Sequence, residues 1–105
     1  MTHATLQRIL AAHALWLQNP RAPGAARANL CRAGLGCANL ANADLQKIVA
    51  KRACLASADL SGADLRLADL SHANLTSANL TNADLRGAKL READLSRARL
   101  TGARF

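Results

Sequence analysis

A strict five-residue period runs from Ala28 to Phe105 and constrains this chain more than any other feature of its sequence. Of the sixteen positions at this spacing from Leu30 onward, fourteen are leucine, and the exceptions are Ala50 and Phe105. The residue two places earlier is alanine in every repeat but one, which has Ile48. The residue between the two is most often Asp or Asn. Any fold of this segment has to give the leucines a common interior.

Neither an ordinary helix nor a flat strand satisfies this period. Five steps along an α-helix turn the side chain by about 140° net, so the leucines would scatter around the helix. On a strand, successive side chains point to opposite faces, so an odd spacing would also separate them. The leucines share one interior if the chain bends once per repeat and stacks on itself. Short fixed-period repeats of this kind are typical of solenoids, whose units bury their apolar faces against their neighbours.

The pattern Ala-Asp/Asn-Leu-x-x closely resembles the pentapeptide-repeat proteins, and the resemblance covers residues 28–105. It implies an all-β solenoid, a right-handed quadrilateral β-helix in which four pentapeptides make one square coil. The leucine and the preceding small residue would point inward, and sixteen repeats would make four coils. We therefore expect an N-terminal capping helix and linker over residues 1–24, followed by the β-helix over residues 25–105.

The first nineteen residues predict a short amphipathic helix. Thr2 or Thr5 could cap its start, and Pro20 and Pro23 would end it. Its apolar stripe, at helical spacing, comprises Leu6, Ile9, Leu10, His13, Trp16 and Leu17. An open solenoid end exposes core leucines and unpaired backbone, so we interpret this helix as a cap, with a partner-binding helix as the alternative. His13 is predicted to be a packed polar residue and not a ligand.

Composition excludes several classes of function. No segment is apolar for the roughly 20 residues that a membrane span needs, so we expect no membrane insertion. Three cysteines (Cys31, Cys37 and Cys54) cannot all pair internally and match no zinc pattern, which favours a cytoplasmic protein with free thiols. The scattered histidines and the absence of a glycine-rich phosphate loop predict a non-enzyme without cofactor or metal.

The net charge of +7 is distributed unevenly if residues twenty apart stack on one another. Nine of the fourteen basic residues then fall on two adjoining sides of the prism. The candidate contact residues for a polyanion or a partner are Lys47, Lys51, Arg52, Arg66, Arg86, Lys89 and Arg91. One column stacks Asp44, Asp64 and Asp84, and the arginines beside it could instead serve to offset the repulsion between these carboxylates.

The repeat is irregular in one stretch, Ile48 to Cys54. Ile48 stands where alanine is usual and Ala50 where leucine is usual, so total core volume is nearly conserved. Such swaps are tolerated in cores, which predicts a compensated pair. The alternative is a kink or an exposed patch that marks a contact site.

Three functions remain open from the sequence. The first is a non-catalytic structural or protein-interaction module with an unknown protein partner. The second is weak binding of nucleic acid or another acidic surface through the basic half, although aromatic residues for stacking are absent from the repeats. The third follows from the resemblance: quinolone-resistance pentapeptide proteins act on DNA gyrase, some through an acidic rod that mimics DNA. This chain is basic and short by comparison.

The last coil predicts a homodimer. Its leucines and its open strand edge would face water, and a two-fold contact between two such ends would hide both. We expect Leu100 and Phe105 at this contact. The alternative is that the Phe105 ring alone seals a monomer.

Overall fold

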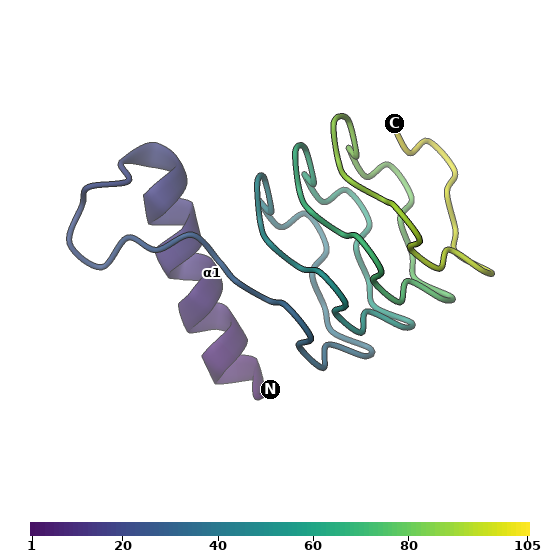
Figure 1. The fold of residues 1–105 in the computed structure, drawn as a ribbon, viewed down its shortest axis with the longest axis horizontal. Coiled ribbons are helices and arrows are strands. Elements are labelled where there is room, and N and C mark those ends of the chain that lie inside the picture. The colour runs from purple at the N-terminus through teal and green to yellow at the C-terminus, as the bar shows by residue number, and fades with distance from the viewer.

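The computed structural model describes residues 1–105 and contains one helix, α1, which spans His3–Gln18. Of the two predicted caps, Thr2 is the one used, because its side-chain oxygen accepts the backbone N–H of Thr5 at 3.1 Å. The helix ends before Pro20, and Gly24 then turns the chain with a positive φ of 80°. Figure 1 shows α1 beside one end of a stack of angular coils.

Residues twenty apart in the sequence lie side by side throughout the stack. Parallel bridges join such pairs from Asn29 with Val49 to Asp84 with Arg104. Each repeat also repeats its hydrogen bonds: Leu30 N–H donates to Val49 O at 2.6 Å, and Val49 N–H donates to the carbonyl of Ala28 at 3.2 Å. The bridges are isolated and form no longer strand, because the chain turns once per repeat. The period of five is therefore the length of one side of the stack.

Each side ends in a tight turn with an uncommon backbone conformation. The N–H of Ala33 donates to the carbonyl of Leu30 at 3.0 Å, and the residue between them at the third turn position, Arg32, has φ of 60°. A positive φ at this position is typical of type II turns and favours glycine. Glycine occupies it in only three repeats, at residues 62, 87 and 102. The inter-coil hydrogen bonds on both sides of each turn hold the other residues in this strained region.

Ten of the sixteen repeats carry Asp or Asn before the leucine position, and this side chain accepts a backbone N–H of the turn that follows it. Asn29 Oδ1 accepts the backbone N–H of Cys31 at 3.1 Å, and Asp59 Oδ1 accepts both the N–H and the hydroxyl of Ser61, at 3.0 and 2.6 Å. These are Asx turns, in which a side chain replaces a backbone acceptor. They explain why a short polar residue recurs between the two inward-facing ones.

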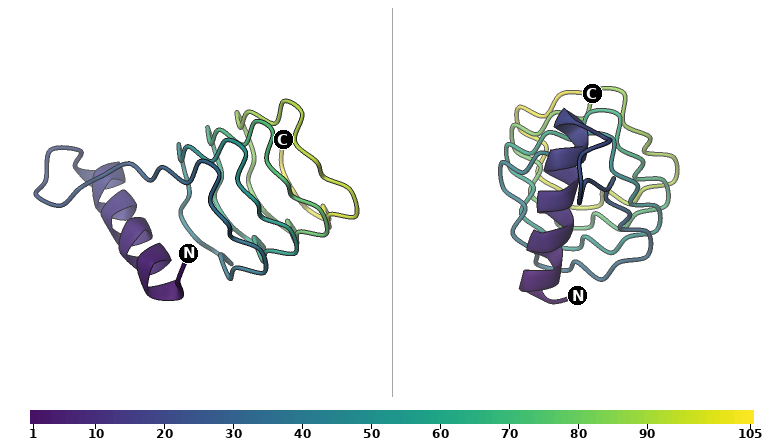
Figure 2. Two further views of the ribbon diagram at one scale, coloured as in Figure 1. Left: turned by 60° about the horizontal axis from the view of Figure 1, so that its bottom comes forward. Right: turned by 90° about the vertical axis from the view of Figure 1, so that its left-hand side faces the viewer.

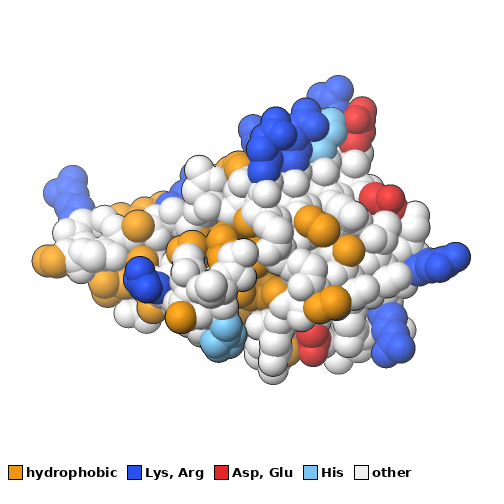
Figure 3. Space-filling model, turned by 90° about the horizontal axis from the view of Figure 1, so that it is seen from below, with side chains coloured by type: hydrophobic (Ala, Val, Ile, Leu, Met, Phe, Trp, Pro, Cys, Tyr) orange, Lys and Arg blue, Asp and Glu red, His pale blue; other side chains and the backbone are white.

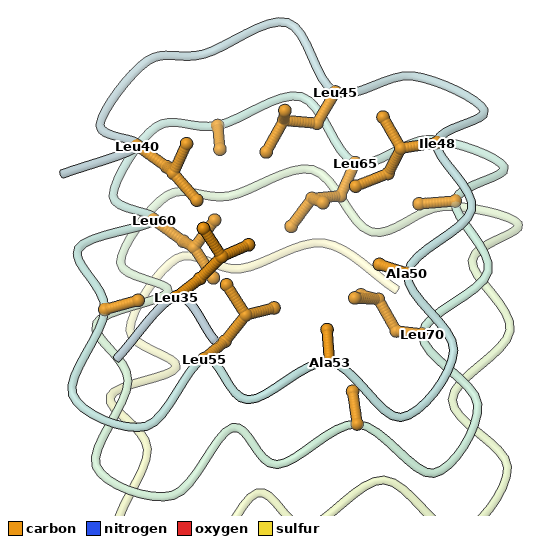
Figure 4. Packing of buried hydrophobic residues seen from close by; sticks show 14 of the residues in the cluster. Leu35, Leu40, Leu45, Ile48, Ala50, Ala53, Leu55, Leu60, Leu65 and Leu70 are labelled. Atoms are coloured by element: carbon orange, nitrogen blue, oxygen red, sulfur yellow. The ribbon is translucent and has the colours of Figure 1, made fainter. Parts of the chain in front are cut away.

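The core is one column of leucine and alanine side chains that point into the stack (Figure 4). In the irregular stretch, Ile48 is 1% exposed and Ala50 is 0% exposed, so both fill the column. The predicted compensated pair is confirmed, and the stretch introduces no apolar patch, since Val49 and Cys54 are half-buried. The alternative, a contact site in this stretch, now rests on charged and not on apolar residues, because Lys51 and Arg52 are exposed.

Helix α1 lies across the first coil (Figure 2) and is held there by His13. The imidazole is buried, and its Nδ1 accepts the backbone N–H of Ala28 at 3.0 Å. An N–H cannot accept, so the ring proton is on Nε2, which donates to the carbonyl of Gln46 at 2.8 Å. Burial lowers the pKa of His13, which keeps the ring neutral as this arrangement requires. The prediction of a packed histidine is correct, and the structure adds its two partners.

Replacing Gly62 by alanine is expected to lower the free energy of unfolding by about 1–3 kcal/mol. Gly62 has φ of 67°, and an added Cβ would lie 2.2 Å from Asn42 Oδ1 in the coil below. Gly34→Ala is the matched control, because no atom lies within 4 Å of its Cβ position and its φ is not positive. Urea unfolding of both variants measures the difference. Equal stability of the two would contradict the role assigned to this turn.

Candidate functional site

The basic residues on the two predicted sides have different surroundings. On one side, Arg66 donates to both carboxylate oxygens of Asp64, at 2.9 and 2.6 Å, and Arg86 forms the same pair of bonds with Asp84. Arg66 Nε also lies 3.9 Å from the carboxylate of Asp84 in the next coil. These arginines offset the repulsion between stacked carboxylates, as the sequence indicated. Their own charge is largely neutralised by the same carboxylates.

The same contacts make the carboxylates strongly acidic. Hydrogen bonds from the Arg86 guanidinium lower the pKa of Asp84 from 3.8 to about 2. The pKa of Asp64 is also lowered, chiefly by the Arg66 guanidinium. Both groups are therefore ionised at any physiological pH.

We expect the protein to lose stability as the pH falls from about 4 to about 2. The pKa of Asp84 is lower in the folded chain, so its contribution is fully present above the unfolded value of 3.8 and is lost as the pH falls through about 2. Denaturant unfolding between pH 2 and 6 measures this loss. Asp84→Asn keeps an amide oxygen for the turn but cannot ionise, so its acid loss should be smaller. If the variant loses as much unfolding free energy in acid as the unmodified chain, Asp84 is not the source of the loss.

The second basic side carries a groove. Its volume is about 640 Å³, and its lining consists of Lys51, Arg52, Asp69, Ser71, His72, Lys89, Leu90 and Arg91. Figure 3 shows Lys and Arg side chains gathered at one edge of the molecule, beside a histidine and an acidic residue. Four cations and one aspartate give the lining a net charge of +3 with the histidine neutral. Four of the seven predicted contact residues thus share one hollow.

The single carboxylate of the groove is already engaged. Asp69 is 8% exposed, and its Oδ1 accepts the N–H and the hydroxyl of Ser71, at 3.1 and 2.7 Å. Lys51 Nζ lies 3.7 Å from its other oxygen. Burial alone would raise the pKa of Asp69, but the Ser71 hydrogen bonds and the charges of Lys51 and Lys89 outweigh it and lower the pKa. Asp69 therefore stays ionised and holds Lys51 over the groove.

The other three cations of the groove have no ion pair in the chain. Arg52, Lys89 and Arg91 are exposed, and none of them lies within 4.0 Å of a carboxylate. Glu92 lies 3.3 Å from Nδ1 of His72, which lines the groove. These free charges distinguish the groove from the side with the arginine–aspartate pairs.

Sequence reasoning missed the polar floor of the groove. Asp69 and Ser71 lie twenty residues from Lys89 and Arg91, so the coil register places them in the same rows. That spacing was the available signal. Lys47, by contrast, was predicted as a contact residue and does not line the groove.

The remaining titratable and thiol side chains form no cluster of possible metal ligands. No three His, Cys, Asp or Glu side chains gather in a way that could hold a metal ion. The cysteines are free, and buried side-chain polar atoms all have hydrogen-bond partners. The single helix is too short to cross a bilayer.

Comparison with known proteins identifies the repeat. The family model described as pentapeptide repeats (8 copies) matches residues 35–71 and 68–105. This chain is a member of the pentapeptide-repeat family. Proteins of the family fold as right-handed quadrilateral β-helices and are generally non-catalytic structural repeat proteins. No curated protein matches the sequence.

Two solved structures of pentapeptide-repeat proteins resemble the chain. One, from Nostoc Pcc 7120, is 42% identical with a TM-score of 0.80, over 97% of this chain and 74% of the other. A second, from the cyanobacterium Cyanothece 51142, is 38% identical with a TM-score of 0.59, over 73% of this chain and 59% of the other. The first covers nearly the whole chain, α1 included. Neither description assigns an activity or a partner.

Proposed function

We propose that this pentapeptide-repeat protein is a non-catalytic structural module that binds a protein partner through one side of its coil stack. The observation that carries the proposal is the groove at Arg52, Lys89 and Arg91, where three cations without an ion pair lie on a rigid support. The interior offers no alternative, because leucine and alanine fill it. A filled column with flat sides can present side chains at fixed spacing, and it has no cavity for a substrate.

Cross-linking in extracts of the native host tests this proposal. The immobilised chain is expected to capture a stoichiometric protein partner, with cross-links that map to one side of the stack. Capture should fail with a denatured chain. Cross-links spread over all sides at low yield, or the discovery of turnover by the isolated chain, would overturn it.

Binding of polyanions is the second candidate function, and the same cluster of cations favours it. Phosphate contacts release counterions, so binding should weaken steeply with salt. Four groove cations make fewer contacts than the 6–10 typical of salt-sensitive DNA binders, so we expect weak binding without sequence preference. A salt titration of duplex binding measures it. DNA mimicry at gyrase needs negative charge and is disfavoured by the net charge of +7.

We further propose that residues 25–105 form four coils and that α1 closes the first of them. The support for closure is the buried His13 and Leu6, which pack against the first coil. His13 accepts the backbone N–H of Ala28 and donates to the carbonyl of Gln46. The coil itself provides no partner for these two backbone groups. The helix thereby covers both apolar and polar groups of the open end.

The homodimer through Leu100 and Phe105 is also a proposal. Leu100 is 38% exposed and Phe105 is 63% exposed, so the ring does not seal the column. A second copy could cover these side chains and the strand edge beside them. Light scattering of this chain at micromolar concentration should show a dimer, and Phe105→Glu should show a monomer. A monomeric unmodified chain would refute the contact.

A further inference from the structure

We propose that the groove on the second basic side binds a short acidic peptide segment of the protein partner, through carboxylates that contact Arg52, Lys89 and Arg91. This inference rests on the proposed interaction function and names the chemistry of its partner. The groove lining carries a net charge of +3, and these three cations form no ion pair within 4.0 Å in the chain. Arginine binds carboxylates in a bidentate fork, and lysine binds them as a point charge.

The dimensions of the cluster fit a short segment. Lys51 and Arg91 are forty residues apart, which is two coil steps or about 10 Å along the stack. This length corresponds to about seven residues of an α-helix or about three extended residues. Asp69, the one carboxylate of the lining, lies in the floor of the groove and is paired with Lys51, and Glu92 is paired with His72. A short acidic sequence can therefore contact all the free cations at once.

Two observations favour a peptide over a nucleic acid. Arg66 and Arg86 on the adjoining side are paired with carboxylates, which interrupts the positive area there. The groove lining also contains no Phe, Tyr or Trp on which a nucleic-acid base could stack. Leu90 lines the groove, and Leu67, two residues before Asp69, is 57% exposed. Aliphatic side chains beside cations suit a peptide that mixes carboxylates with apolar residues.

Fluorescence anisotropy with defined probes tests the inference. The probe is a labelled peptide of about eight glutamates, slightly longer than the cluster. A glutamine peptide of the same length, a short DNA duplex and inorganic phosphate are the comparisons. We expect one-to-one binding of the glutamate peptide, weaker binding of phosphate and of the duplex, and no binding of the glutamine peptide.

A matched pair of variants locates the site. Lys89→Glu/Arg91→Glu should lower the affinity for the glutamate peptide by about tenfold or more, because two attractive contacts become repulsive. Arg97→Glu/Arg99→Glu makes the same change of net charge outside the groove and should lower affinity by less than about threefold. Thermal unfolding checks that both variants fold, and Arg91→Gln, which should lower affinity more than Arg97→Gln, replaces the first if it does not.

Three results would overturn the inference. Equal losses in the two double variants would mean that only net charge matters. Tighter binding of the duplex than of the peptide would assign the groove to polyanions. Capture of a native partner that survives Lys89→Glu/Arg91→Glu, with no binding of the glutamate peptide, would place the interface on another side. In that last case the interaction function would stand and the acidic-peptide site would fall.

Discussion

Deletion of residues 1–19 is expected to destabilise the protein by several kcal/mol and to cause aggregation. The helix covers the first coil, where Leu30 and Leu35 are buried at the end of the column. Each leucine that becomes exposed loses about 1.5–3 kcal/mol of burial. The total free energy of unfolding of a small domain is about 5–15 kcal/mol, so the loss is a large fraction of its stability. Thermal unfolding and light scattering of the truncated chain measure both effects.

His13→Ala isolates the polar part of the same contact. It leaves the N–H of Ala28 and the carbonyl of Gln46 without their partners, each at a cost of about 1–3 kcal/mol where water does not replace the imidazole. His3→Ala is the control, because His3 lies on the same helix and is exposed. A truncated chain or a His13→Ala variant with unchanged stability would mean that α1 is not a cap.

The His13 contact should also depend on pH. The pKa of His13 is lowered in the folded chain by burial, so its contribution is fully present above the unfolded value of 6.5 and declines as the pH falls below it. Protonation of Nδ1 would remove the acceptor of the Ala28 N–H. The loss begins at a higher pH than the loss from Asp84, so the two are separable. His13→Ala should abolish the first loss and leave the second.

Ile48→Ala is expected to lower the free energy of unfolding by about 2–5 kcal/mol. Ile48 is 1% exposed and fills space that the small Ala50 leaves in the same coil (Figure 4). Ala50→Leu alone should also destabilise, by about 1–3 kcal/mol, because it overfills a packed column. The double variant restores the usual order of alanine and leucine, so its loss should be clearly smaller than the sum.

A double-mutant cycle of these two positions measures the compensation. A coupling energy of about 0.5–3 kcal/mol is typical of residues that share a core space. Val49→Ala is the control, since Val49 lies between them but is only half-buried, and should cost less than about 1 kcal/mol. If the losses of unfolding free energy from Ile48→Ala and Ala50→Leu simply add in the double variant, the two side chains do not compensate for each other's volume.

The five-residue period was sufficient to predict much of the architecture. It indicated a solenoid with inward leucines and alanines, and the buried column from Leu30 to Leu85 agrees with it. The square coil came from the family resemblance, and bridges between residues twenty apart now show the register. Where Asp or Asn precedes the leucine, it forms an Asx turn with residues of its own repeat. These features are local or repeat in every unit, so sequence alone carries them.

The basic groove was decided by tertiary structure. The sequence assigned Arg66 and Lys89 to one basic half and left open whether each is paired with a carboxylate. In the fold, Arg66 reaches Asp64 at 2.6 Å, whereas Lys89 has no carboxylate within 4.0 Å. Which cations are neutralised depends on side-chain direction between stacked coils. Only the folded chain determines that direction.

The role of His13 also required the structure. The amphipathic stripe correctly placed it on the buried face of α1, but its partners, Ala28 and Gln46, lie 15 and 33 residues away. No repeat or spacing connects the helix to these two backbone groups. The sequence by itself determined the repeating column, because each repeat carries its own pattern of small, polar and large residues. The contact of α1 with the first coil and the basic groove were decided by the tertiary structure. Both depend on groups that meet only when separate segments of the chain pack together.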